Sequence, residues 1–177
     1  PYEELVRENG RRGGGDPEYE LLDTGILDED RFFDVEVEYA KAGPDEVLMR
    51  IRARNMSPDP APLHLLPTVW FRNTWSWAAL SREERPSLRL DESTVVATHP
   101  TLGTYRIAAR AHGAAGRWLF TDNETAASGP DVPPGFTKDA FHRLLVDGDA
   151  AAVNHAGSGT KAAYAARWLV APGATVE

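Results

Sequence analysis

The stretch PLHLLPTVWFRNTWSW, from Pro62 to Trp77, guides the interpretation of the whole chain. It holds three of the five tryptophans of the protein. If the segment is extended, Trp70 points to one face and Val69 and Phe71 point to the other, so both faces are apolar. A strand of this kind needs cover on both sides.

The composition is that of an acidic globular protein. The chain has 177 residues and a formal net charge of −8 without a basic stripe, which disfavours nucleic acids and anionic membranes as partners. Cysteine is absent, which excludes disulfides and thiolate nucleophiles and favours a cytoplasmic location. The sequence shows neither a membrane-spanning run nor a signal peptide. Because it opens at Pro1 without a methionine, we expect a piece of a longer protein.

Two alternating segments predict a β-hairpin with one register. Phe33–Ala40 and Val47–Asn55 each alternate apolar and charged residues, and a Gly-Pro-Asp turn lies between them. Placing Tyr39 opposite Met49 matches every charge on the other face. The matched pairs are Glu38 with Arg50, Glu36 with Arg52 and Asp34 with Arg54. A slip of one residue would turn three carboxylates toward the core, so these charges have a structural role.

The other patterns predict many short strands and few helices. Pro67 marks a bulge or an edge position in the aromatic stretch, because proline cannot donate to a β-ladder. We expect helices over Tyr2–Gly10 and Lys138–Val146, where apolar residues recur at helical spacing. Further strands are expected at Tyr19–Leu22, Thr94–Thr98, Gly103–Arg110, Trp118–Thr121 and Thr160–Pro172, and loops at Thr74–Trp77, Ser81–Pro86 and Ala126–Gly135.

Turn-separated strands without βαβ alternation predict a mainly β fold. The expected architecture is a large antiparallel β-sandwich, similar to a supersandwich, with one or two short helices. We divide the chain into a leading segment, residues 1–18, and a β-sandwich domain, residues 19–177. The leading segment combines a short helix with a glycine-rich loop.

The chain lacks the motifs of common catalytic and cofactor sites. The five histidines show no metal-ligand spacing, and no G-x-S-x-G, Walker or G-x-G-x-x-G motif occurs. We therefore expect neither a metal nor a cofactor. A glycosidase requires two carboxyl groups across a sugar. Asp122, Glu124 and Asp139 lie near predicted loops, although Asp122 and Glu124 also suit the capping of a strand end.

The aromatic stretch also mixes rings with polar groups in a way that suits carbohydrate recognition. Trp75 and Trp77 offer indole rings on which the C–H faces of a sugar stack, and neighbouring side chains offer hydrogen bonds. The other interpretation is that both rings are buried against a neighbouring domain. The candidate sugar-contacting or interdomain residues are Arg72, Asn73, Trp75, Trp77, Asn123 and Glu124.

Five motifs in consistent order carry a resemblance to a known family. They are ELLDTG (Glu20–Gly25), Asp34–Ala40 in the run FDVEVEYAKA, LHLLPTVWFRNTWSW (Leu63–Trp77), FTDNET (Phe120–Thr125) and GTKAA (Gly159–Ala163). From about Tyr19 to Tyr164 the chain resembles the N-terminal region of bacterial glucosidase-like proteins of glycoside hydrolase family 63. The longest motif is the most specific.

The resemblance implies a β-sandwich domain that precedes an (α/α)6 barrel. In that family the barrel supplies the general acid and general base of an inverting hydrolysis of α-glucosidic bonds. No part of this chain resembles the barrel, so the resemblance implies a non-catalytic domain that packs on and supports it, with oligosaccharide as a further partner. The chain departs from the family pattern at Asn154-His155, where Asn-Pro is usual, and at Tyr164–Trp168.

Two other functions stay open at the level of sequence. The chain could be a stand-alone carbohydrate-binding module that uses Trp75 and Trp77, or an autonomous enzyme that uses Asp122, Glu124 or Asp139. A supporting domain predicts apolar surface exposed on the chain by itself. A binding module predicts an open aromatic platform, and an enzyme requires a concave pocket with paired carboxylates.

Overall fold

The computed structural model describes residues 1–78, 84–125 and 135–177, and it is mainly β, as predicted. Its strands form three antiparallel sheets. The elements in chain order are α1 (Tyr2–Asn9), the 3₁₀ helix η1 (Leu21–Thr24), β1 (Phe33–Gly43), β2 (Glu46–Asn55), β3 (Ala61–Leu65), β4 (Thr68–Trp70), α2 (Trp75–Ala78), β5 (Ser87–Asp91), β6 (Thr94–His99), β7 (Gly103–Ile107), β8 (Gly116–Thr121), α3 (Ala140–Val146), the 3₁₀ helix η3 (Ala150–Ala152), β9 (Ser158–Gly159), β10 (Lys161–Val170) and β11 (Thr175–Val176).

The residues group into two compact units, which we describe separately. Unit 1 consists of Pro1–Leu63 and Trp168–Glu177, and unit 2 consists of His64–Arg167. Strands β3 and β10 each contribute residues to both units. All residues of unit 1 are described, whereas the residues outside the description, 79–83 and 126–134, belong to unit 2.

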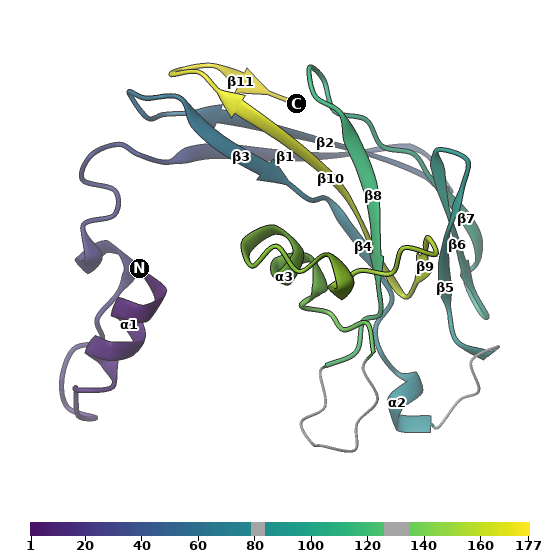
Figure 1. The fold of residues 1–177 in the computed structure, drawn as a ribbon, viewed down its shortest axis with the longest axis horizontal. Coiled ribbons are helices and arrows are strands. Elements are labelled where there is room, and N and C mark those ends of the chain that lie inside the picture. The colour runs from purple at the N-terminus through teal and green to yellow at the C-terminus, as the bar shows by residue number, and fades with distance from the viewer. Residues whose placement is uncertain (79–83, 126–134) are drawn as a thin grey trace. The chain divides into compact units, whose positions relative to one another are not determined.

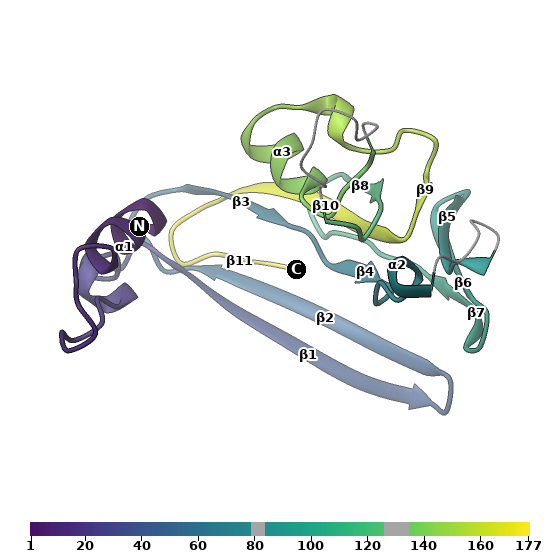
Figure 2. The ribbon, with the colours of Figure 1, turned by 90° about the horizontal axis from the view of Figure 1, so that it is seen from below.

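Unit 1 is built around the β1–β2 hairpin, in which the two strands run side by side along their length (Figure 2). The predicted register is confirmed, and all three predicted charge pairs lie opposite each other. Arg50 Nε donates to Glu38 at 2.6 Å, and Arg52 Nη2 donates to Glu36 at 2.5 Å. The hydrogen bond with Glu38 raises the pKa of Arg50. Because these pairs are exposed, they select the register more than they stabilise the unit.

The other face of the hairpin is apolar and open, whereas the sequence predicted a half-buried face. Val35, Val37 and Tyr39 of β1 are 48%, 45% and 71% exposed, and Val47 and Met49 of β2 are 65% and 45% exposed. We call these five side chains the hairpin face. Within unit 1 the hairpin sheet gains only the two-residue strand β11, which pairs near the root of β2. Unit 1 itself therefore leaves the distal part of this face uncovered.

Asn55 holds the open end of the hairpin, which we call its root, where it pairs with Phe33. Its side chain is fully buried, and its Nδ2 donates to the carbonyl oxygens of Asp59 at 2.8 Å and Val170 at 2.9 Å. Its Oδ1 accepts the backbone N–H of Ser57 at 2.9 Å, and its own N–H donates to Ala174 at 3.0 Å. One amide thus holds together the end of β2, the turn that follows it and the C-terminal segment.

Replacement of Asn55 by alanine should destabilise unit 1 by about 3 kcal/mol, because it leaves two carbonyls and one N–H without their partners at a buried place. Urea unfolding followed by circular dichroism measures the change. The control is Asp59→Ala, which removes only the exposed ion pair with Arg31 and should cost less than about 1 kcal/mol. Equal losses in the two variants would be inconsistent with the role assigned to Asn55.

Unit 2 has three layers (Figure 1). The middle layer belongs to the four-stranded sheet in which β10 lies between β3 and β4 and also pairs with β8. The sheet of β7, β6, β5 and β9 packs on one side of it, and α3 and η3 pack on the other. The core between the two sheets contains Leu88, Val95, Ala97, Phe120 and Ala162. Leu119 and Ala163 point to the opposite face and contact Phe141 of α3 and its neighbours. The two packed sheets form the predicted sandwich.

The strand predicted at Tyr19–Leu22 is wrong, because a local turn replaces it. The backbone N–H of Glu20 donates to Asp23 Oδ2 at 2.8 Å in a capping box that starts η1. Gly25 then ends the turn with a left-handed φ of 67°. Strand β5 was not predicted, because the charged residues before and within it obscured the alternation of its apolar and polar side chains.

The aromatic stretch is divided into three elements instead of one strand. β3 ends and β4 begins on either side of Pro67, which lacks an N–H but accepts the N–H of Tyr164 at 3.1 Å. The expected loop at Thr74–Trp77 is wrong, because α2 begins at Trp75. Asn73 Oδ1 caps this helix by accepting the N–H of Ser76 at 3.2 Å.

The helices predicted over Tyr2–Gly10 and Lys138–Val146 are confirmed as α1 and α3, so α2 is a third short α-helix where one or two were expected. Of the other expected loops, residues 81–83 and 126–134 lie outside the described part of the chain.

Candidate functional site

The six residues predicted for a site all lie at one corner of unit 2, where the segments after β4 and β8 meet. We call residues 71–77 and 122–124, together with Arg85, the α2 corner. Asn73 Nδ2 donates to the carbonyl of Asn123 at 3.2 Å, and Asn123 Nδ2 donates to the carbonyl of Phe71 at 2.9 Å. The fold thus joins segments that are about fifty residues apart in the sequence.

Trp75 is the buried centre of the α2 corner. Its side chain is 1% exposed, and its indole Nε1 donates to Glu124 Oε1 at 2.8 Å. Arg85 Nη1 donates to the same oxygen at 3.0 Å. Because this ring is buried within the chain, Trp75 has no surface on which a sugar could stack.

The ends of three strands are held against the α2 corner by short hydrogen bonds. Asn123 N donates to Thr160 Oγ1 at 2.7 Å, and Thr160 N donates to Asp122 Oδ1 at 3.1 Å. Gly159 permits this approach, because a Cβ at that position would lie only 2.1 Å from the carbonyl oxygen of Thr121. The corner therefore depends on a glycine for space and not for backbone freedom.

Gly159→Ala should destabilise unit 2 by about 2 kcal/mol or more, since the added methyl group meets backbone that cannot move aside cheaply. Thermal unfolding followed by tryptophan fluorescence reports this loss. Gly43→Ala is the control, because open space surrounds a Cβ at that strand position, and it should change stability by less than about 0.5 kcal/mol. A Gly159→Ala variant as stable as the control would refute the close packing of the strand ends.

Trp77 is the exposed counterpart of Trp75 on the same helix. Its side chain is 73% exposed, and the guanidinium carbon of Arg72 lies 5.5 Å from the centre of its ring. This arrangement is a cation–π contact on one face of the indole. The expectation that both faces of the aromatic stretch are covered is wrong for the face of Trp70, which is 56% exposed. The opposite face is covered, because Val69 packs against the core between the two sheets.

The three candidate carboxylates are held by hydrogen bonds of the fold. Glu124 binds the indole of Trp75, and Asp122 accepts the N–H of Thr160. Asp139 accepts the hydroxyl of Thr137 at 2.5 Å, which lowers the pKa of Asp139 and keeps it ionised. A general acid of a glycosidase must instead stay protonated near neutral pH, so Asp139 is unsuited to that role.

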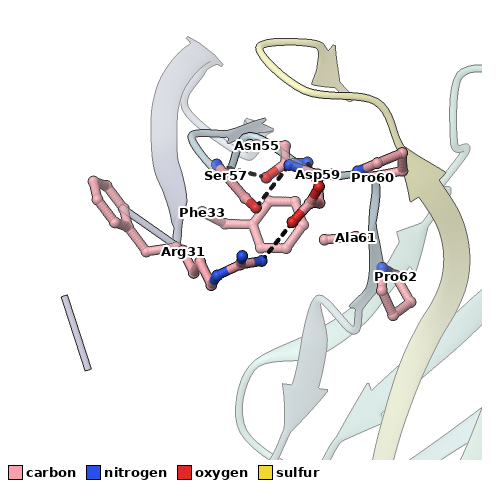
Figure 3. Close-up of a pocket in the computed structure, with 9 residues that line it drawn as sticks. Arg31, Phe33, Asn55, Ser57, Asp59, Pro60, Ala61 and Pro62 are labelled. Atoms are coloured by element: carbon pink, nitrogen blue, oxygen red, sulfur yellow. Dashed lines mark hydrogen bonds and ion pairs between the residues drawn. The ribbon is translucent and has the colours of Figure 1, made fainter. Parts of the chain in front are cut away.

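A shallow pocket of about 240 Å³ lies in unit 1 beside the root of the hairpin (Figure 3). Arg31 and Asp59 face each other across it with an Nη1–Oδ2 distance of 2.6 Å. Hydrogen bonds to Glu29 and Asp59 raise the pKa of Arg31. Asp59 also donates its N–H to Ser57 Oγ at 3.1 Å. These polar groups therefore bind one another, and the rest of the lining is mainly phenylalanine, proline and alanine.

Residues 1–78, 84–125 and 135–177 contain neither a metal-binding cluster nor a membrane-spanning helix. No three histidine or carboxylate side chains in these ranges gather into a group that could hold a metal ion. None of the helices there combines the length and the apolar character that crossing a membrane requires.

Comparison with known proteins gives one informative likeness. No family model matches the chain, and no solved structure matches it significantly. The chain is 32% identical, over an alignment 196 positions long, to the uncharacterized protein YMR196W of Saccharomyces cerevisiae. The alignment covers 92% of this chain but only 18% of the yeast protein. The chain thus spans less than a fifth of the length of this curated relative.

Proposed function

We propose that the chain is a non-catalytic β-sandwich domain of an α-glucosidase-like enzyme of glycoside hydrolase family 63. In this proposal it packs on and supports an (α/α)6 catalytic barrel in the same longer polypeptide. The observation that carries the proposal is the α2 corner, where an exposed tryptophan and an arginine are presented by a short helix whose other tryptophan is buried. Tryptophan and arginine are enriched at the energetic centres of protein interfaces.

The hydrogen bonds at the corner favour a protein partner over a sugar. Sugar recognition requires polar groups that converge on the ligand beside an aromatic ring. Here the amides of Asn73 and Asn123 and the carboxylate of Glu124 bind other parts of unit 2. Arg72 also covers one face of the Trp77 ring. Among the described residues, what remains exposed is a ring with few uncommitted hydrogen-bonding neighbours, which suits an apolar pocket of a neighbouring domain.

The yeast relative adds support of a different kind. Nearly the whole chain aligns with a small part of a much longer polypeptide, so a homologous segment exists in a protein with ample sequence for further domains. The engaged carboxylates support the same conclusion, because a domain that uses them to build its fold is a poor candidate for the catalytic pair.

The proposal predicts that Trp77 matters only when the rest of the polypeptide is present. In the complete polypeptide, Trp77→Ala should lower the rate of glucose release from α-glucosides several-fold, because the support of the barrel is loosened. Tyr105→Ala is the matched control, since Tyr105 is also an exposed aromatic residue of unit 2, at 47%, and it should leave the rate unchanged. The 177-residue chain alone should release no glucose. A complete polypeptide that hydrolyses no α-glucoside would overturn the assignment.

The exposure of Trp77 also supports a second candidate, a stand-alone carbohydrate-binding module. Calorimetric titration of the chain with glucose, maltose and longer α-glucosides separates the two functions. The supporting-domain proposal predicts no heat of binding. Sub-millimolar affinity that Trp77→Ala abolishes and Tyr105→Ala preserves would favour the binding module instead. Trp75→Ala is not informative about sugar contact, because its buried ring serves the fold.

A further inference from the structure

We infer that the hairpin face of unit 1 is a second docking surface, which binds an apolar surface of the longer polypeptide outside residues 1–177. This inference rests on the proposed function, since it assumes that the chain works as one domain of a larger protein. It concerns different residues from the α2 corner. The surface consists of Val35, Val37, Tyr39, Val47 and Met49.

The two faces of the hairpin differ in chemistry. The reverse face carries Glu36, Glu38, Arg50 and Arg52 in cross-strand ion pairs, which keeps it well hydrated and almost neutral. Every residue of the hairpin face is uncharged, and Val and Tyr side chains of this kind favour a packed sheet surface. A sheet with one charged face and one apolar face is typical of packing on one side only.

Along β2 the exposure of the apolar side increases from root to tip, whereas Val35 of β1, opposite Ala53 at the root, is already 48% exposed. Every second residue of β2 lies on this side, and the exposed fraction of the residue rises from 0% at Ala53 to 45% at Met49 and 65% at Val47. Single exposed apolar residues are common, but five neighbours on one strand pair form a contiguous patch of the kind that marks an interaction site. On β2 the uncovered part is therefore a continuation of a surface that is buried at its root.

The hairpin face is also formed before any partner arrives. Pairing between β1 and β2 is continuous from Phe33 and Asn55 at the root to Lys41 and Val47 near the turn. The ion pairs on the reverse face hold the register, and the buried Asn55 holds the root. Docking on such a preformed surface requires little ordering of the chain, which favours stable association.

The length of the yeast relative supports an occupant in the same polypeptide. Because the chain aligns with only 18% of that protein, the homologous hairpin is synthesised together with a much larger amount of chain. A permanently apolar surface resembles an obligate interface, and a partner in the same polypeptide is always present to cover it. The occupant must itself be apolar and uncharged where it meets the five side chains, since burial of an unpaired charge would be costly.

Met49 and Leu48 provide a matched test. They are adjacent and similarly exposed, at 45% and 54%, but they point to opposite faces of the hairpin. In the complete polypeptide, Met49→Glu should increase the rate of proteolysis at the hairpin at least tenfold, whereas Leu48→Glu should change it less than twofold. In the 177-residue chain both variants should unfold at the same urea concentration as the parent within error. Val37→Thr, which keeps the side-chain shape, gives a milder version if Met49→Glu prevents folding.

Several results would overturn this inference. Equal effects of Met49→Glu and Leu48→Glu in the complete polypeptide would show that the hairpin face remains exposed to solvent. A loss of stability specific to Met49→Glu in the 177-residue chain would place the cover within that chain. A concentration-dependent dimer that Met49→Glu dissociates would assign the face to a second copy. These readouts do not depend on hydrolysis. An inactive complete polypeptide would therefore overturn the proposed function, while the proteolysis and unfolding results would still decide this inference.

Discussion

The hydrogen bond between the buried indole of Trp75 and Glu124 is the interaction on which the α2 corner depends. It joins the segments after β4 and β8, which are 49 residues apart in the sequence, and Arg85 binds the same carboxylate oxygen. Because a helix of four residues has no stability of its own, α2 persists only while Trp75 is anchored. The anchored helix then presents Trp77 to the outside.

The same division between internal polar groups and external apolar groups recurs in unit 1. The fully buried Asn55 uses its amide to hold the root of the hairpin, and the ion pairs of the reverse face select the register. The valines, Tyr39 and Met49 are left exposed by their own unit. In both units the polar side chains form hydrogen bonds or ion pairs within their own unit. The exposed apolar side chains that remain are suited to contact with protein. This division is consistent with the supporting role that we propose.

The structure also shows which features a single sequence can predict. The hairpin register was predictable because apolar and charged residues alternate together, so that only one alignment satisfies both faces. Asn73, Trp75 and Glu124 were proposed as sugar-contacting or interdomain residues, but the hydrogen bond between Trp75 and Glu124 was not predicted, because it joins partners far apart in the chain. Helix α2 escaped prediction for the same reason. Exposure of the hairpin face could not be predicted, since alternation shows which side is apolar but not what covers it.

The central claim is that exposed apolar groups of this chain are interfaces within a larger protein. Oxidative footprinting by mass spectrometry, performed on the 177-residue chain and on the complete polypeptide, tests it most directly. The account predicts that Trp77 and Tyr39 react readily in the chain and become strongly protected in the complete polypeptide, while Tyr105 reacts equally in both. Equal reactivity of Trp77 and Tyr39 in the two proteins would contradict it.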